Sequence, residues 1–378
     1  MKTLRNRYYF FLLSISLLAK SSKAQVDSIY HQGGYRTFIL HLPANYNSAN
    51  SYPLILNFHG FNSNALQQEA YTGFDGIADT AGFIVVYPQG INNTWNIAQG
   101  STDVDFASAL IDSLKQDYSI DSTCVYATGM SLGGFLSYVL ACDLSGKLAA
   151  IAPVAGNMTV AQQADCFPVK GMPVLEIHGQ ADIVVSYNGG FGLPTVPETI
   201  AWWVTANSCD TPGIMTPVPD INTADNCTAV KITYGNGMDN SEVIHYRIAG
   251  GGHTWPGAIP IPLLGNTCQD FNASVEIWKF FRKYCASITA VDEIESKDFR
   301  IYPNPFTDEI SVEIRQRNSK SAAVVIRNIL GQTVFSDQEI KGNNVFTRTI
   351  NLRELATGIY FLDMIIEGER TVKKIVKQ

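Results

Sequence analysis

Residues 123–136 read TCVYATGMSLGGFL, and this stretch decides the fold of the chain. Residues 123–128 are short and nearly continuously apolar, as buried parallel strands are. The turn GMSLGG at 129–134 follows, and residues 132–142 predict an apolar helix. A glycine-flanked turn between a strand and a helix exposes the hydroxyl at its corner, because small neighbours avoid a clash there. Ser131 is therefore the candidate nucleophile, and a glycine-rich helix start is the alternative.

The alternation of predicted strands and helices continues on both sides of this stretch. Apolar runs predict strands at residues 35–42, 53–58, 83–87, 123–128, 148–154, 173–177 and 243–248. Helix candidates lie between them at residues 104–117, 132–142, 199–206 and 272–284. Strands that alternate with helices predict an α/β domain around a mostly parallel sheet.

A serine hydroxyl needs a base to remove its proton, and His253 is the candidate. It lies in GGGHTWP at 250–256, just after the strand that ends near residue 248, and this fold places the base late in the chain. His31 and His41 come too early in the chain, and His245 lies within a predicted strand. His59 and His178 each precede a glycine and are interpreted as loop-packing residues.

The base needs a carboxylate to fix its tautomer and stabilise its cation. Asp182 follows the predicted strand at 173–177, at the sheet edge where active-site loops gather in open α/β folds. It also satisfies the chain order serine, acid, histidine. Asp165 and Asp210 satisfy that order too, but they lie in segments that look like surface loops.

The tetrahedral intermediate that forms when a serine attacks a carbonyl needs two backbone donors for its oxyanion. The N–H of Leu132 follows the nucleophile directly, and the second donor is expected after an early strand. The strand at 53–58 leads into His59-Gly60-Phe61, so the N–H of Phe61 is the second candidate. Trp95 and Trp255 lie in or near loops on the same face, and they are either pocket walls for an aromatic or apolar acyl group or ordinary core aromatics.

The N-terminus predicts export. Residues 1–24 carry five Lys/Arg and no acids, a short apolar run at 8–18 and small residues before Gln25, as a signal peptide does. The apolar run falls short of the roughly 20 residues that a membrane anchor needs, and no later stretch is long and apolar enough to span. Residues 25–290 hold 9 Lys/Arg against 21 Asp/Glu, a net charge of −12, which argues against nucleic-acid partners.

Seven cysteines lie between Cys124 and Cys285, and the odd count leaves at least one unpaired. Cys124, in a predicted core strand, is the candidate for the free thiol. Cys268 and Cys285 flank a predicted helix roughly 20 Å long, too long for the residues after Cys268 to bring the two together. The sequence holds no CxxC pair or histidine cluster that would suggest a metal site.

The character of the chain changes after residue 287. Residues 288–299 are polar and predict a linker between a catalytic domain at 25–287 and a third segment at 300–378. That segment has short β-type runs separated by turns and contains no cysteine, which predicts a small antiparallel β-sandwich.

Several motifs together resemble the secreted esterase family that includes polyhydroxybutyrate depolymerases and feruloyl esterases. They are LNFHG at 56–60, DVDF at 103–106, IDSTCVYATGMSLGG at 120–134, AAIAPVAG at 149–156, His178-Gly179 with Asp182, and GHTWPG at 252–257. The resemblance implies an α/β-hydrolase fold, the triad Ser131–Asp182–His253, the Phe61 and Leu132 oxyanion donors and no cofactor. It also implies the disulfides Cys142–Cys166 and Cys209–Cys227. Leu132 departs from the small or polar residue that this family often carries there.

The last segment resembles a type IX secretion sorting domain. Its motifs are IYPNP at 301–305, NILGQ at 328–332, LATGIY at 355–360 and KKIVK at 373–377. The resemblance implies an exported cargo that engages the type IX secretion machinery and whose tag is usually cleaved. A carbohydrate-binding or spacer sandwich is the alternative.

Taken together, these features predict an extracellular or cell-surface carboxylic ester hydrolase. Feruloyl or related esters of plant polysaccharide are favoured, because the sorting domain stands where a polyester-binding module is expected. Polyhydroxyalkanoate depolymerase and acetylxylan esterase are the alternatives. A peptidase is disfavoured, since residues 25–290 leave no room for a propeller or a large lid. A catalytically silent surface-binding protein is the alternative outside the enzymes.

Overall fold

The computed structural model describes residues 25–285, 299–315, 322–328, 333–340, 345–366 and 369–378. The chain divides into two compact units, Met1–Ile288 and Thr289–Gln378, and each is described by itself. The expected signal peptide at 1–24 and most of the expected linker lie outside the described residues.

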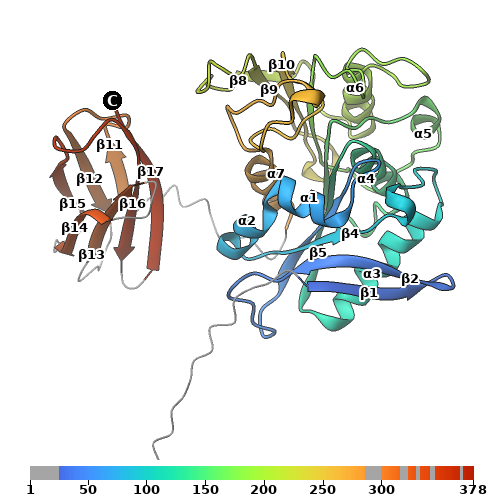
Figure 1. Cartoon of the computed structure of the whole chain (residues 1–378), viewed down its shortest axis with the longest axis horizontal. Helices are drawn as coiled ribbons and strands as arrows, with labels where there is room; N and C mark the ends of the chain where they lie inside the picture. The colour runs from blue at the N-terminus through green and yellow to red at the C-terminus, as the bar shows by residue number, and fades with distance from the viewer. Residues whose placement is uncertain (1–24, 286–298, 316–321, 329–332, 341–344, 367–368) are drawn as a thin grey trace, which may run out of the picture. The chain divides into compact units, whose positions relative to one another are not determined.

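The first unit is built on one ten-stranded sheet (Figure 1). Its strands, in sheet order, are β1 (Gln25–His31), β2 (Gly34–His41), β4 (Ile84–Pro88), β3 (Tyr52–Phe58), β5 (Ile120–Met130), β6 (Ala150–Val154), β7 (Val174–Gly179), β10 (Val243–Ala249), β9 (Thr228–Tyr234) and β8 (Ile214–Pro217). The six strands from β4 to β10 run parallel, and the two at each edge pair antiparallel. The predicted mostly parallel sheet is confirmed.

Helices cover both faces of this sheet. They are α1 (Ala65–Thr72), α2 (Phe74–Ala81), α3 (Thr102–Asp117), α4 (Leu132–Asp143), α5 (Val160–Ala164), α6 (Val196–Ala206) and α7 (Ala273–Phe281), with short 3₁₀ turns η1 (Ile91–Asn93), η2 (Met238–Asn240), η3 (Pro262–Leu264) and η4 (Arg282–Tyr284). Strand β3 is therefore buried on both of its faces. Leu54 and Leu56 join one buried cluster with α3, α4 and α6. Ile55 joins the other cluster, with α2 and α7. A parallel strand buried on both faces has the continuous apolar sequence seen here.

The second unit consists of two antiparallel sheets. One contains β11 (Phe299–Tyr302), β12 (Glu309–Arg315) and β15 (Val345–Asn351), and the other contains β14 (Thr333–Ile340), β13 (Ala322–Asn328), β16 (Gly358–Ile366) and β17 (Glu369–Lys377). Inward side chains from both sheets, such as Ile310 and Leu362, form one apolar cluster. The predicted antiparallel β character of this segment is confirmed.

Two disulfides are present in the first unit. Cys142, in α4, is bonded to Cys166, as the family resemblance implies. The expectation that Cys124 is free is wrong, since Cys124 in β5 is bonded to Cys285. The reason is that α7 and η4 pack over the sheet face that Cys124 enters, which brings the Cα atoms of the two cysteines to 4.8 Å.

The expected disulfide Cys209–Cys227 is also wrong: no bond joins these two buried cysteines, and they lie far apart. Cys227 directly precedes β9, whereas the chain after Cys209 is bonded at the far end of that strand, where the Asp210 N–H donates to the Gly235 carbonyl. A seven-residue strand spans about 23 Å, far beyond the reach of a disulfide. No helix in the described part of the chain is long and apolar enough to cross a membrane.

Candidate active site

Ser131 occupies the strained corner that the sequence predicts. It follows β5 directly and stands at the N-cap of α4 with φ 55° and ψ −121°. A positive φ is costly for a non-glycine residue and persists only where the surroundings hold it. Here the Ser131 N–H donates to the carbonyl of Val154 at 2.9 Å, in the neighbouring strand β6.

Glycines permit this corner because backbone atoms crowd around it. A methyl group on Gly129 would lie 2.6 Å from the carbonyl oxygen of Phe58. A methyl group on Gly133 would overlap the same oxygen. Gly60 faces the nucleophile, since its own methyl position lies 3.4 Å from the Ser131 Cβ. The glycines therefore bring the end of β3 against the serine turn.

Asp182 and His253 form a hydrogen-bonded pair at the same edge of the sheet. Asp182 comes three residues after β7, and its Oδ2 accepts a hydrogen bond from His253 Nδ1 at 2.7 Å. The other oxygen, Oδ1, accepts from the backbone N–H groups of Val184 and Val185, each at 2.8 Å. Because Nδ1 faces the carboxylate, Nε2 of His253 is the nitrogen that can act as a base.

The loop that carries His253 is held by a second segment of the chain. The His253 N–H donates to the Leu264 carbonyl at 2.7 Å, and the Gly252 N–H donates to the Asn266 carbonyl at 2.9 Å. The His253 side chain is 5% exposed, so the ring has little freedom to turn. Residues 262–268 therefore act as a backing segment for the His253 loop.

A buried polar chain on the far side of Asp182 was not anticipated. His178 Nε2 lies 3.5 Å from Asp182 Oδ2 and donates to the Val185 carbonyl at 2.9 Å. Its Nδ1 faces Glu176 Oε1 at 2.9 Å, and Glu176 Oε2 accepts from the Tyr138 hydroxyl at 2.6 Å. The side chains of Tyr138, Glu176, His178 and Asp182 are all buried. His178 thus does more than pack a loop, because it joins Asp182 to the interior of the unit.

The electrostatics of these hydrogen-bonded side chains explain why their polar groups can be buried. Burial by itself lowers the pKa of His178, but the hydrogen bond and charge of Glu176 and the charge of Asp182 outweigh it and raise that pKa. Burial raises the pKa of Glu176, and hydrogen bonds from His178 and Tyr138 oppose that rise. The sequence carries a signal for the contact between Glu176 and His178. Side chains alternate between the two faces of a strand, so these two residues of β7 must share one face.

Two further histidines act as neutral hydrogen-bonding groups. His59 Nδ1 donates to the Gly60 carbonyl at 2.7 Å, and its Nε2 accepts from the Gly90 N–H at 3.0 Å. Burial lowers the pKa of His59 and lowers that of His245 to about 3. His245 Nε2 lies 3.1 Å from the Tyr187 hydroxyl inside the sheet region. His59 therefore holds the turn that leads to Phe61.

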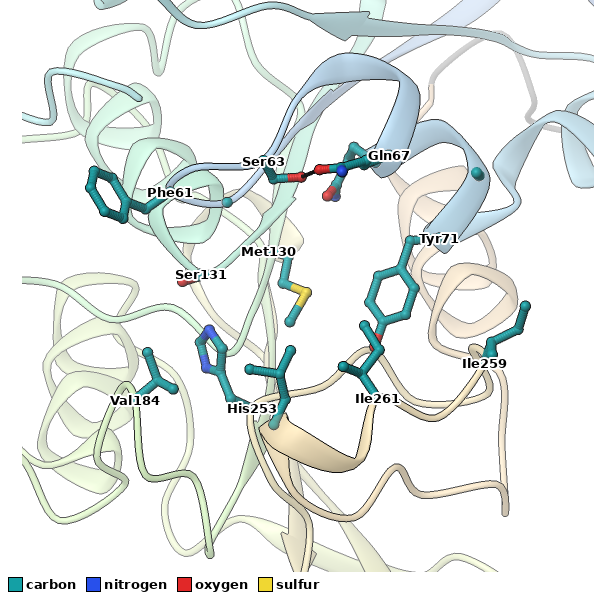
Figure 2. Close-up of a pocket in the computed structure, with 14 residues that line it drawn as sticks. Phe61, Ser63, Gln67, Tyr71, Met130, Ser131, Val184, His253, Ile259 and Ile261 are labelled. Carbon is teal, nitrogen blue, oxygen red and sulfur yellow. Dashed lines mark hydrogen bonds between the residues drawn. The ribbon is translucent and has the colours of Figure 1, made fainter. Parts of the chain in front are cut away.

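Ser131 and His253 line the same pocket, which has a volume of about 660 Å³. Figure 2 shows them on the side of Phe61 and Val184, with Met130 in the middle and Tyr71 opposite. The remaining lining residues are Gly60, Ser63, Gln67, Gln68, Ala70, Ile259, Ile261 and Leu264. The lining is mostly apolar, and the reacting groups stand at one end of it.

One candidate oxyanion donor follows the nucleophile in the chain, and the other follows Gly60, which lies against Ser131 in space. Leu132 is the first residue of α4, and the N–H groups in the first turn of a helix have no carbonyl partner within that helix. Phe61 follows Gly60 at the pocket wall, with its side chain 63% exposed. The chemistry assigned to Leu132 and Phe61 uses backbone atoms, so their side chains remain free to shape the entrance.

The prediction that Trp95 and Trp255 are pocket walls is wrong. Neither lines the pocket that Ser131 and His253 share, and the two residues are 4% and 1% exposed. Trp95 Nε1 donates to the His59 carbonyl at 2.8 Å, and Trp255 Nε1 donates to Ser274 Oγ at 3.0 Å. Both indoles are large enough to fill the core under the loops, and each finds its acceptor there.

Other side chains provide the apolar wall. Tyr71 comes from α1, and its hydroxyl accepts a hydrogen bond from the Trp255 N–H at 3.3 Å. Ile259 and Ile261 come from the loop after His253, and Val184 comes from the loop after Asp182. No sequence motif marks these positions, because they are surface-loop and helix residues whose proximity depends on the tertiary fold.

A parallel sheet covered on both faces, with a serine elbow after β5 and an acid–histidine pair after β7 and β10, defines an α/β hydrolase. The chain belongs to the family described as "Putative esterase", which matches residues 31–243. Residues 300–378 match the "Secretion system C-terminal sorting domain", so this segment is a sorting domain of the type IX class.

Several curated proteins are similar to this chain. The "Bifunctional acetylxylan esterase/xylanase XynS20E" of Neocallimastix patriciarum is 36% identical over 159 residues, 41% of this chain and 23% of that protein. "Putative esterase NocK" of Nocardia uniformis subsp. tsuyamanensis is 30% identical over 54% of this chain and 66% of its own length. "Feruloyl esterase B" of Piromyces equi is 28% identical over 58% of this chain and 42% of its own length. The matches thus span less than two thirds of each relative.

The solved "Acetyl xylan esterase from Aspergillus awamori" shares the fold. Its similarity has a TM-score of 0.52 at 15% identity and covers 68% of this chain and 98% of that structure. At this identity the likeness concerns the fold alone. The fold class predicted from the sequence is confirmed.

Proposed function

We propose that this chain is an exported serine-type carboxylic ester hydrolase that works through an acyl-enzyme. The observation that carries the proposal is the convergence of Ser131, on its strained elbow, and the Asp182–His253 pair at one pocket. The putative esterase family supports the same class of reaction.

The proposal gives each group a step in the reaction. Ser131 Oγ attacks the ester carbonyl while His253 Nε2 takes its proton, and Asp182 stabilises the resulting imidazolium. The oxyanion of the tetrahedral intermediate accepts hydrogen bonds from the Leu132 and Phe61 N–H groups. The alcohol leaves with the proton from His253, and a water activated by the same base releases the acid. The proposal requires no cofactor.

The pocket favours an aromatic or other bulky acyl group. Its volume of about 660 Å³ and its apolar wall of Tyr71, Met130 and Ile261 far exceed what an acetyl group fills. Burial of apolar area contributes about 25 cal/mol per Å², so a larger acyl group gains more from this wall. Gln67 and Ser63, hydrogen-bonded to each other at the pocket edge, offer polar partners for a phenolic substituent.

Feruloyl esters of plant polysaccharide are therefore the proposed substrates, and the similarity to a feruloyl esterase supports this choice. Acetylated xylan is a second candidate, because another relative carries an acetylxylan esterase name. Polyhydroxyalkanoate is the third, since an open apolar pocket also suits a polyester chain. The sorting domain supports export through the type IX machinery to the cell surface or beyond.

Two measurements test the function. Fluorophosphonate labelling of the folded chain, followed by peptide mapping, is expected to modify Ser131, with Ser131→Ala as the control. Absence of labelling in folded protein would favour a catalytically silent binding protein. Rates on methyl ferulate, acetylated xylan and a polyhydroxybutyrate suspension are then compared, and a preference for either polymer would overturn the feruloyl assignment.

A further inference from the structure

Two buried thiols of the first unit lie beside the same aspartate, Asp225. Among the described residues, Cys209, Cys227 and Cys268 are in no disulfide, and all three are buried. Cys227 and Cys268 are 41 positions apart in the chain, but both sulfurs lie beside Asp225. Cys227 Sγ is 3.6 Å from the Asp225 carbonyl oxygen, and Cys268 Sγ lies within 4.8 Å of an Asp225 carboxylate oxygen. Cys209 lies toward the other end of β9, away from this pair. The pair is therefore a cysteine site that neither known disulfide uses.

The two turns that carry these thiols are bonded to each other. Asp225 accepts from the Cys227 N–H at 2.8 Å and from the Gln269 N–H at 2.6 Å, so it joins the two turns. Cys227 Sγ donates to the Asp225 carbonyl at 3.6 Å, and Cys268 Sγ donates to Asp270 Oδ2 at 3.7 Å. The backbone around the thiols is thus fixed by hydrogen bonds that do not require a bond between the sulfurs.

A metal ion is the competing explanation for this cluster. Ligand atoms of Asp225, Cys268 and Asp270 lie within 4.8 Å of one another. However, both Asp225 oxygens accept backbone N–H groups, and Asp270 Oδ1 accepts two more, from Ile221 and Asn222. Backbone donors that point at these oxygens satisfy the carboxylates without a cation. The arrangement therefore favours a covalent link between the thiols.

We propose that Cys227 and Cys268 form a third disulfide in the exported protein. The step is a thiol–disulfide exchange with a disulfide-bearing oxidant, either a protein oxidoreductase or a small molecule such as glutathione disulfide. One Sγ–Sγ bond forms, the two thiols lose two protons and two electrons, and the oxidant is reduced to two thiols. An extracytoplasmic location permits this chemistry. The inference is independent of the reaction assigned to the pocket.

The surroundings also determine when the bond forms. Burial, with the charges of Asp225 and Asp270, raises the pKa of Cys227 to about 11. Burial raises the pKa of Cys268 to about 12. Because the thiolate is the reactive species, exchange in the folded protein is slow. The bond is therefore made while the chain folds, and it resists exchange afterwards.

The link would enclose the candidate base. The chain between Cys227 and Cys268 contains β9, β10, His253 and the pocket residues Ile259 and Ile261. Cys268 ends the backing segment, and its carbonyl accepts the Gly257 N–H at 2.8 Å. Joining this segment to the start of β9 fixes both ends of the His253 loop. The disulfide should therefore stabilise the apolar wall of the pocket against heat.

Thiol counting tests the bond directly. The full chain, isolated after export and denatured without reductant, is expected to show one free thiol, that of Cys209. Non-reducing peptide mapping should recover residues 227 and 268 in joined peptides. Three free thiols, in protein that has also been refolded with excess glutathione disulfide, would overturn the proposal. Stoichiometric zinc or calcium in elemental analysis of the isolated protein would overturn it as well.

Matched variants test the consequence. Cys227→Ser with Cys268→Ser is expected to lower Tm by about 5–10 °C, as the loss of a disulfide does in a domain of this size. Cys209→Ser is the control, because it removes a buried thiol outside the pair and should leave the joined peptides intact. An equal fall in Tm for both proteins would show that burial of the sulfurs, and not a bond, accounts for the effect.

Discussion

The two sides of the pocket differ in what builds them. The side that carries Ser131 is made of backbone, since Gly129 and Gly133 have no room for a methyl group beside Phe58. The opposite side is made of side chains, and several are well exposed, such as Ile259 at 80%. Close backbone packing fixes the reaction geometry, whereas exposed side chains can change without disturbing the fold. The backbone-built side therefore defines the chemistry, and the side-chain-built side defines the substrate.

The largest effect is expected at the nucleophile. Ser131→Ala removes the attacking oxygen and should lower kcat by at least about 10³-fold on methyl ferulate. Tm should stay close to that of the parent, because the substitution adds no atoms to the crowded corner. Retention of parental kcat by the folded variant would contradict the assignment of the reaction to this side.

The next effect tests the crowding itself. Gly133→Ala forces a methyl group onto the Phe58 carbonyl, which must shift, and the Gly60 turn with it. We expect kcat to fall about 10²-fold and the free energy of unfolding to fall by about 3 kcal/mol. The matched control is Gly76→Ala in α2, where an added methyl group meets nothing within 4 Å. That control should raise stability by about 0.5 kcal/mol, and equal losses in the two variants would contradict the comparison.

A third variant tests the buried side of Asp182. Glu176→Gln keeps the shape of the side chain but removes the charge that His178 Nδ1 faces. His178, which lies beside Asp182, then loses the charge that orients it, so kcat should fall about 10-fold with KM unchanged within about twofold. Glu276→Gln is the control, because Glu276 also accepts a tyrosine hydroxyl, that of Tyr246 at 2.7 Å, but lies in α7. A similar kcat for both variants would show that the Glu176 chain is only structural.

The side-chain-built wall should affect substrate choice and little else. Ile261→Ala removes apolar contact area and should lower kcat/KM for methyl ferulate about fivefold, while the rate on methyl acetate stays unchanged. Leu263→Ala is the control, since this neighbouring side chain is 90% exposed and is not among the lining residues. If both esters slow equally, the wall is not an acyl-binding surface.

The smallest expected effect concerns α1, the helix that carries Tyr71. Burial, followed by the nearby Asp75 carboxylate, raises the pKa of Glu69 to about 7. A carboxyl group whose pKa is raised in the folded state makes the folded protein less stable as pH rises from the unfolded-state pKa toward 7. Glu69→Gln should therefore raise Tm by about 1–2 °C at pH 8, a small shift because Glu69 is only partly buried and solvent screens its charge. Near pH 4 the variant should leave Tm unchanged, because the carboxyl group is then largely protonated in the folded and the unfolded state.

Glu198→Gln supplies a control of opposite sign for that experiment. Hydrogen bonds from the Thr195 N–H and hydroxyl lower the pKa of Glu198 in the capping box of α6. A lowered carboxyl pKa contributes stability that is present at neutral pH and lost in acid. This variant should lower Tm at pH 8 and have less effect near pH 4. The same sign for both variants would contradict the assigned shifts.

Much of the fold could be predicted because buried parallel strands have a distinctive sequence. Runs such as residues 53–58 and 123–128 are apolar on both faces, and the structure places them in β3 and β5. The edge strands β1 and β8 were missed, since nearly every residue in them is exposed and no apolar run marks them. An edge strand forms because it pairs with a neighbouring strand, and its own sequence carries little pattern that marks it as a strand.

The candidate site was predictable to the same degree. Ser131, Asp182 and His253 each follow a buried strand, so their chain order and strand ends placed them at one edge of the sheet. The cysteine pairs and the roles of the tryptophans were not predictable, because they depend on how helices and loops pack over the sheet. Cys124 looked free from its strand alone, and only the position of η4 supplies its partner.

The disulfide Cys124–Cys285 has a mechanical consequence. Cys285 is the last described residue of the first unit, and the chain continues from it toward the sorting domain. A pull from that direction passes through the sulfur–sulfur bond into β5 before it loads α7. β5 is bonded on both edges, to β3 and to β6, so the load falls on the middle of the sheet. Tension on a tethered molecule would thus be resisted by a strand bonded on both edges, which is also the one that ends at Ser131.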